Sequence, residues 1–120
     1  MARVLVLDDE AAISMMLQDW LTELNCETVG PAYCVKDALT LIDTACPDAA
    51  ILDLCVRNET SYAVATSLRA RRVPFAFATG YGDSSIAAAF QDEIIVSKPF
   101  DFAKIKEVLA KLLRQGSQTS

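Results

Sequence analysis

Five polar residues of types suited to phosphoryl chemistry each end or follow a short apolar run. Asp8 and Asp9 follow "RVLVL", Asp53 lies in "DAAILDL", Thr79 ends "FAFAT" and Lys98 follows "EIIVS". Carboxylates that share a small space repel one another until a proton or a cation enters. Magnesium suits such a cluster because it is a hard ion that prefers oxygen ligands. Together with a lysine and a hydroxyl, these groups could transfer a phosphoryl group to an aspartate.

The apolar runs alternate with segments of helical period, and this alternation predicts the elements that position those residues. The predicted strands are Arg3–Leu7, Cys26–Val29, Asp48–Leu54, Phe75–Ala78 and Glu93–Val96. "GPAY" is predicted to turn the chain after the second strand. The predicted helices are Glu10–Leu24, Val35–Ile42, Ser61–Ala70, a short segment "DSSIAAAF" and Phe102–Leu113.

Strands that alternate with helices in this length predict a doubly wound α/β fold, a parallel sheet with helices on both faces. The candidate residues then all lie at the carboxyl edge of the sheet, where such folds hold their ligand crevice. With strand order 2-1-3-4-5, the first and third strands are neighbours about 4.8 Å apart. Asp53 would then lie close to Asp8 and Asp9.

Each candidate residue also has an ordinary structural interpretation. An Asp-Asp pair before a helix is a common helix cap. Asp53 could bond only to backbone amides, Thr79 could be a turn residue, and Lys98 could be a solvated lysine. Their shared position at one edge of one sheet favours a single site.

Composition restricts the other possibilities. The chain has 120 residues, 52% of them hydrophobic, and a net charge of −5. This size predicts one domain over residues 1–115 with a flexible tail at 116–120. The negative charge disfavours nucleic acid as a partner. No membrane span and no signal-peptide pattern is apparent, so we expect a cytoplasmic protein.

Cysteine and histidine content narrows the chemistry further. Cys26, Cys34, Cys46 and Cys55 form no Cys-x-x-Cys pair and fall in or beside apolar segments, so we expect reduced thiols in the core. The sequence has no histidine. This excludes a Ser-His or Cys-His dyad and a histidine metal site supplied by this chain alone.

With these residues in place, the chain resembles a response-regulator receiver domain of the CheY-like, flavodoxin-like (βα)5 class, from Arg3 to about Leu113. The resemblance implies the sheet order 2-1-3-4-5 and Asp53 in "ILDLC" as the phosphoacceptor. It also implies Mg²⁺ ligation by Asp8, Asp9, Asp53 and the main-chain carbonyl of Cys55, phosphoryl binding by Thr79 and Lys98, and a Lys98–Pro99 bond that is commonly cis.

A narrower likeness concerns the stretch "PFAFATGYG" together with "VGPAY". It is similar to the receiver subfamily nicknamed FAT GUY, which is associated with histidine kinases of the HWE class. The resemblance therefore implies such a kinase as the partner and a phosphorelay as the process. It implies no conventional enzyme, because a receiver catalyses only its own phosphorylation and dephosphorylation.

Two departures from the commoner receiver pattern bear on signalling. Ile95 stands where receivers usually have an aromatic gate, and Tyr81 could replace that gate or be an ordinary loop tyrosine. The predicted fourth helix is short, below the roughly 12–15 residues an isolated helix needs. We therefore expect residues 80–91 to be mobile before phosphorylation and more ordered afterwards.

Two other functions remain open from the sequence. One is a pseudo-receiver that binds proteins without being phosphorylated. The other is a phosphatase of the haloacid-dehalogenase type, which needs a second Asp where this chain has Cys55. A receiver that belongs to a longer regulator is also compatible with the sequence. The sequence does not identify the downstream partner.

Overall fold

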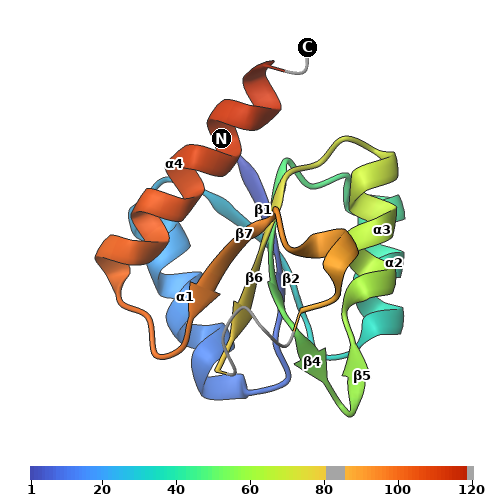
Figure 1. Cartoon of the computed structure of the whole chain (residues 1–120). Coiled ribbons are helices and arrows are strands. Elements are labelled where there is room, and N and C mark those ends of the chain that lie inside the picture. Colours follow the sequence, from blue (N-terminus) through green and yellow to red (C-terminus); the bar gives the residue numbers. More distant parts are fainter. Residues whose placement is uncertain (81–85, 119–120) are drawn as a thin grey trace.

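A parallel five-stranded sheet with helices on both faces forms the body of the protein, in a computed structural model (Figure 1). The structure describes the backbone of residues 1–80 and 86–118, and the side chains in these ranges up to residue 115. The strands of the sheet are β1 (Arg3–Leu7), β2 (Glu27–Ala32), β3 (Ala49–Asp53), β6 (Phe75–Thr79) and β7 (Ile94–Ser97). Their order is β2-β1-β3-β6-β7, which is the predicted 2-1-3-4-5 order.

The described helices are α1 (Ala11–Glu23), α2 (Val35–Ala45), α3 (Tyr62–Ala70) and α4 (Phe102–Gln118), and residues Ala88–Phe90 form a 3₁₀ turn, η2. Helices α1 and α4 cover one face of the sheet, and α2 and α3 cover the other (Figure 1). This is the predicted doubly wound fold. Among the described residues, no helix is long and apolar enough to cross a membrane.

Alternating side chains of each strand form two cores, one on each face of the sheet. In β1, Val4 and Val6 pack on the α1 and α4 side, whereas Leu5 and Leu7 pack on the α2 and α3 side. Every residue of β3 and of β6 is buried, as expected for central strands covered on both faces. The continuous apolar runs of the sequence therefore reflect burial on both sides.

The second strand differs from the prediction. Instead of turning at "GPAY", β2 continues through Gly30 and Pro31 to Ala32, with an irregular register opposite Leu5 and Leu7. Gly30 has a φ of +97°, and a Cβ there would lie 2.7 Å from the backbone nitrogen of Ala32. Since β2 is an edge strand, it tolerates the missing N–H of the proline.

The segment that joins β6 to β7 was predicted to contain the short helix of residues 83–90. Residues 81–85 lie outside the described part of the chain, and residues 88–90 form a 3₁₀ turn. Phe90 in this turn stacks on Tyr62 of α3 with ring centroids 4.9 Å apart, and the guanidinium of Arg69 lies 4.3 Å from the Phe90 ring. Arg69 also pairs with Glu93 at 2.7 Å. These contacts fix the described end of the segment against α3.

The cysteines and the C-terminal helix also differ in part from the prediction. All four cysteines are free, as expected, but Cys46 and Cys55 are exposed, so the prediction of core thiols is wrong for these two. Cys46 is the C-cap residue that ends α2, and Cys55 lies on a strand between the buried Leu54 and Val56 with its own side chain exposed. Helix α4 continues to Gln118, beyond the predicted domain end at residue 115, while residues 119 and 120 are outside the described range.

Candidate phosphoacceptor and metal site

The register of the sheet brings the acidic residues together. The last paired residues of β1 and β3 are Leu7 and Leu52. Asp8 and Asp53 follow them directly and therefore emerge side by side at the carboxyl edge. The side chain of Asp8 is 3% exposed and that of Asp53 is 11% exposed, so both carboxylates are largely shielded from water.

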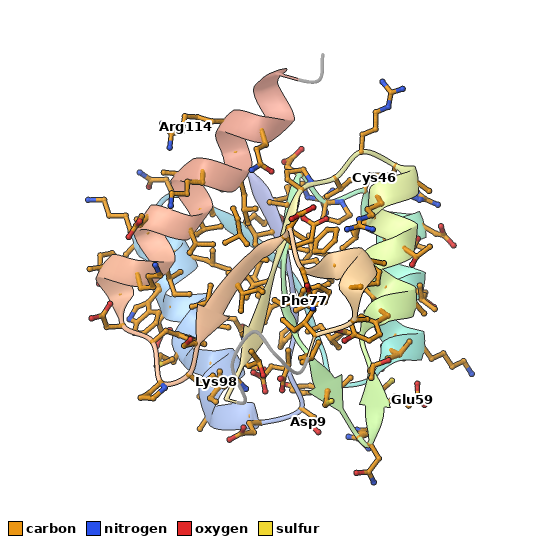
Figure 2. All side chains as sticks on the ribbon, viewed as in Figure 1. Asp9, Cys46, Glu59, Phe77, Lys98 and Arg114 are labelled. Atoms are coloured by element: carbon orange, nitrogen blue, oxygen red, sulfur yellow. The ribbon has the colours of Figure 1, made fainter. Side chains whose placement is uncertain are left out.

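Thr79 and Lys98 reach the same edge from the next two strands. Asp53 pairs with Ala78 in the β3–β6 register, and Thr79 pairs with Ser97 in the β6–β7 register. The N–H of Lys98 donates to the carbonyl of Thr79 at 2.9 Å. The Lys98–Pro99 peptide bond is cis, as the family resemblance implied. Asp9 and Lys98 accordingly lie at one end of the molecule, opposite Arg114 (Figure 2).

The ammonium group of Lys98 links the carboxylates. Its Nζ lies 3.3 Å from an oxygen of Asp8 and 3.3 Å from an oxygen of Asp53. The exposed side chain of Glu10 approaches the same nitrogen at 3.8 Å. Lys98 is therefore not simply a solvated lysine, because its charge offsets two shielded carboxylates.

Asp8 is fixed by the start of helix α1. Its Oδ1 accepts a hydrogen bond from the N–H of Glu10 at 2.8 Å, and its carbonyl accepts one from the hydroxyl of the buried Ser14 at 3.0 Å. The N-cap residue of α1 is Glu10, which makes no side-chain capping bond. Asp8 thus bonds to the backbone near the helix start while its other oxygen faces Lys98.

The three carboxylates fit a hard divalent cation. Asp8, Asp9 and Asp53 each offer an oxygen, and these oxygens lie within 4.8 Å of one another. Carboxylate oxygens are preferred ligands of Mg²⁺, which also keeps bound waters and leaves room for a phosphate oxygen. A cavity of about 270 Å³ opens at this point. Its lining residues are Asp9, Glu10, Asp53, Leu54, Cys55, Thr79, Gly80 and Lys98.

Burial raises the pKa of both inner carboxyls. For Asp53, burial and the neighbouring charge of Asp8 outweigh the attraction of Lys98 and raise the pKa to about 6. Burial also raises the pKa of Asp8, against the Glu10 N–H and Lys98. For Lys98, burial lowers the pKa, but the charges of Asp53 and Asp8 have the greater effect and raise it. The site is therefore short of positive charge.

Sequence reasoning missed two residues of this site. Glu10 lines the cavity, and the backbone N–H of Arg57 donates to Asp9 Oδ2 at 2.9 Å. Arg57 lies at the tip of a short hairpin made by β4 (Cys55–Val56) and β5 (Glu59–Thr60), which was not predicted. The signal in the sequence was Asn58 in "VRNET", since Asn favours the positive φ of a two-residue hairpin loop.

Ile95 and Tyr81 are the two residues considered for the aromatic gate. Ile95 is half-buried on β7 and packs against the core on the α2 and α3 side. Tyr81 lies outside the described residues.

The family model of the response regulator receiver domain matches residues 4–110 of this chain. The chain belongs to this family. Receiver domains bind Mg²⁺ at an acidic pocket and are phosphorylated by histidine kinases in two-component systems. They are signalling domains and not conventional enzymes.

Solved receivers resemble this chain closely. The solution structure of SdrG from Sphingomonas melonis Fr1 is 40% identical, covers 94% of this chain and 97% of that chain, and superposes with a TM-score of 0.83. TrrA from Thermotoga maritima, solved in complex with Mg²⁺ and BeF, is 29% identical, covers 94% of this chain and 100% of that chain, and has a TM-score of 0.82.

A curated relative extends beyond the receiver. The sensory transduction protein LytT of Bacillus cereus is 33% identical over 96% of this chain but only 48% of its own length. The chain thus spans about half the length of the curated relatives it matches. Membership in the receiver family does not favour the alternative function of a haloacid-dehalogenase-type phosphatase.

The raised pKa of Asp53 predicts an effect of this residue on stability. Ionised Asp53 destabilises the metal-free fold above about pH 6, and this cost disappears as the pH falls toward the unfolded value of 3.8. We therefore expect Asp53→Asn to raise the free energy of unfolding at pH 7.5 by about 3 kcal/mol without divalent cations. The gain should shrink steadily between pH 6 and pH 4.

Denaturant unfolding at several pH values measures this gain. Asp19→Asn, on the exposed side of α1, is the matched control and should change stability little at any pH. An Asp53→Asn protein less stable than wild type at pH 7.5 would show that the Lys98 ion pair outweighs the burial of the carboxylate.

Proposed function

We propose that this receiver accepts a phosphoryl group from a histidine kinase onto Asp53, holds it for a time and loses it to water. The observation that carries the proposal is the position of the Asp53 carboxylate, which lies beside Asp8, 3.3 Å from Lys98 and at the wall of an open cavity. An oxygen of Asp53 attacks phosphorus, the P–N bond to the kinase histidine breaks, and an aspartyl phosphate forms. Water later attacks phosphorus and releases phosphate.

The proposed metal ligands are Asp8, Asp9, Asp53 and the main-chain carbonyl of Cys55. Bound there, Mg²⁺ would offset the negative charge of the phosphoryl oxygens. The cluster of three oxygens within 4.8 Å supports this assignment. The partial shielding of the site from water strengthens each of these electrostatic interactions.

Lys98 and Thr79 are proposed to bind the phosphoryl group once it is on Asp53. Lys98 already lies within ion-pair distance of that carboxylate, and Thr79 lines the same cavity. A phosphoryl oxygen on Asp53 would give the ammonium group of Lys98 an anionic partner that is more exposed to water than the carboxylate of Asp8. The hydroxyl of Thr79 can donate to a second phosphoryl oxygen, and this would move the chain that follows β6.

The donor is proposed to be a histidine kinase of the HWE class, and the chain a member of the FAT GUY subfamily. The stretch "PFAFATGYG", together with "VGPAY", supports this narrower assignment. A second cavity of about 390 Å³ also supports a protein donor. This cavity is lined by residues of the β7–α4 connection and of α1: Lys98, Pro99, Phe100, Ile13 and Met16. It adjoins the acceptor site because Lys98 also lines the cavity at Asp53.

A pseudo-receiver remains the second candidate function. It would share the fold and the contact surfaces but would not be modified. The convergence of Asp8, Asp53 and Lys98 favours the phosphorylated receiver, since a purely binding role does not require this combination of charges at one point.

Intact mass spectrometry tests the proposal. After incubation with Mg²⁺ and a small phosphodonor, wild type should gain the mass of one phosphoryl group. Asp53→Asn should gain none, and Asp19→Asn should behave as wild type. With autophosphorylated kinases as donors, transfer should be at least tenfold faster from an HWE kinase than from one of another class, as expected for a partner that docks specifically.

The possible failures of this experiment are distinct. A wild type that gains no mass, or an Asp53→Asn protein that gains as much as wild type, contradicts phosphorylation of Asp53. Equal transfer rates from both kinase classes contradict only the partner assignment.

Ordering of the chain after β6 gives a second test. We expect Mg²⁺ and beryllofluoride, which mimic the phosphoryl group on Asp53, to slow amide exchange of residues 86–91, because a ligand on Thr79 fixes the start of the segment that contains them. Amides of β1, which are already in the core, serve as the internal reference. Exchange of residues 86–91 that does not change on addition of both reagents would contradict the proposed role of this segment.

A further inference from the structure

We propose that the β4–β5 hairpin positions the metal site, with the main-chain N–H of Arg57 holding the carboxylate of Asp9 in the orientation that a divalent cation requires. This inference rests on the proposed Mg²⁺-dependent function. The hairpin supplies none of the groups that are proposed to bind the phosphoryl group.

The hairpin has a tight two-residue loop. Val56 pairs with Glu59, which leaves only Arg57 and Asn58 to reverse the chain. Their φ angles are 49° and 64°, the positive values that the favoured two-residue hairpin loops need. Asn adopts such values readily, whereas Arg does so only where surrounding contacts compensate.

Two contacts of Arg57 supply that compensation. Its backbone N–H donates to Asp9 Oδ2 at 2.9 Å, and its Nε donates to the carbonyl of Tyr33 at 3.0 Å. The first contact reaches the acidic cluster directly, and the second ties the hairpin to the connection between β2 and α2. The turn is thus held to two other parts of the carboxyl edge.

The consequence for Asp9 follows from its exposure. Asp9 is an exposed residue, so without a partner its carboxylate could rotate away from the site. The bond from Arg57 fixes one oxygen and leaves the other for a cation. Cys55, whose carbonyl is a proposed ligand, lies in the first strand of the same hairpin and pairs with Thr60. One small element therefore controls two proposed contacts with the metal.

Hydrogen-bonded partners of metal ligands commonly change metal affinity by roughly 10- to 100-fold when they are lost. The coupling is also reciprocal, so a cation that prefers the fixed Asp9 must stabilise the hairpin by the same factor. If the hairpin had a purely structural role, loss of the Arg57–Asp9 bond would not change Mg²⁺ affinity, and Mg²⁺ would not stabilise the hairpin. These two measurements therefore distinguish a positioning role from a structural one.

Replacement of the turn residues provides the test. Asn58→Pro fixes φ near −65° and excludes the turn, so the Arg57 N–H leaves Asp9. Arg57→Gly is the control, because glycine accepts the positive φ and keeps the N–H while it removes the guanidinium. Mg²⁺ affinity is measured by NMR titration of each protein with MgCl₂, and melting temperatures show that the variants are folded.

We expect Asn58→Pro to weaken Mg²⁺ binding roughly tenfold or more. We expect Arg57→Gly to bind Mg²⁺ within about twofold of wild type, since the backbone N–H at position 57 still donates to Asp9. In an Asp9→Asn background, Asn58→Pro should have a much smaller effect, because the carboxylate through which it acts is gone. Equal affinity of Asn58→Pro and wild type overturns the inference. A wild type that binds no Mg²⁺ overturns the proposed function instead.

A measurement on the wild-type protein covers the case in which Asn58→Pro does not fold. Saturating Mg²⁺ should slow amide exchange of Arg57 severalfold, because the two equilibria are linked. Exchange of Arg57 that is the same with and without Mg²⁺ overturns the inference without any variant.

Discussion

The mutual repulsion of three carboxylates at one edge of the sheet is the constraint on which this structure depends. Asp8 and Asp53 are largely shielded from water, and Lys98 is the one described side chain that pairs with both carboxylates. Burial and the charge of Asp8 raise the pKa of Asp53 to about 6. The fold therefore concentrates negative charge that costs stability and that a divalent cation would offset, as the proposed metal-dependent acceptor requires.

The remainder of the molecule holds these charges in place. Central strands covered on both faces cannot slide without exposing their alternating apolar residues, so the register that aligns Asp8 with Asp53 is strongly fixed. The same argument applies to β6 and Thr79, since every residue of β6 is buried. The hydrophobic core thus determines the geometry of a site that is itself unfavourable.

Much of this arrangement could be predicted from the sequence. Short apolar runs indicated the strands, and segments with apolar residues at helical spacing indicated the helices. Polar residues at the strand ends indicated the site, because parallel strands end at one edge of the sheet. The long core-facing helices were predicted closely. The candidates Asp8, Asp9, Asp53, Thr79 and Lys98 all line or adjoin one cavity or acidic cluster.

What the sequence did not predict depends on contacts between distant segments. Gly30 and Pro31 read as a turn, yet neighbouring β1 keeps them in a strand. The turn at Arg57 depends on Asp9 and Tyr33, which local propensity cannot include. Cys46 and Cys55 lie only one or two residues from buried positions, and a boundary error of that size exchanges core for surface.

The most direct measurement of the central claim is a structure of this chain with Mg²⁺ and beryllofluoride. The account predicts beryllium bonded to a carboxylate oxygen of Asp53, Mg²⁺ among Asp8, Asp9 and Asp53, and fluorine atoms within hydrogen-bond distance of Lys98 Nζ and the Thr79 hydroxyl. Beryllofluoride bound at another residue, or a metal held without Asp53, would contradict it.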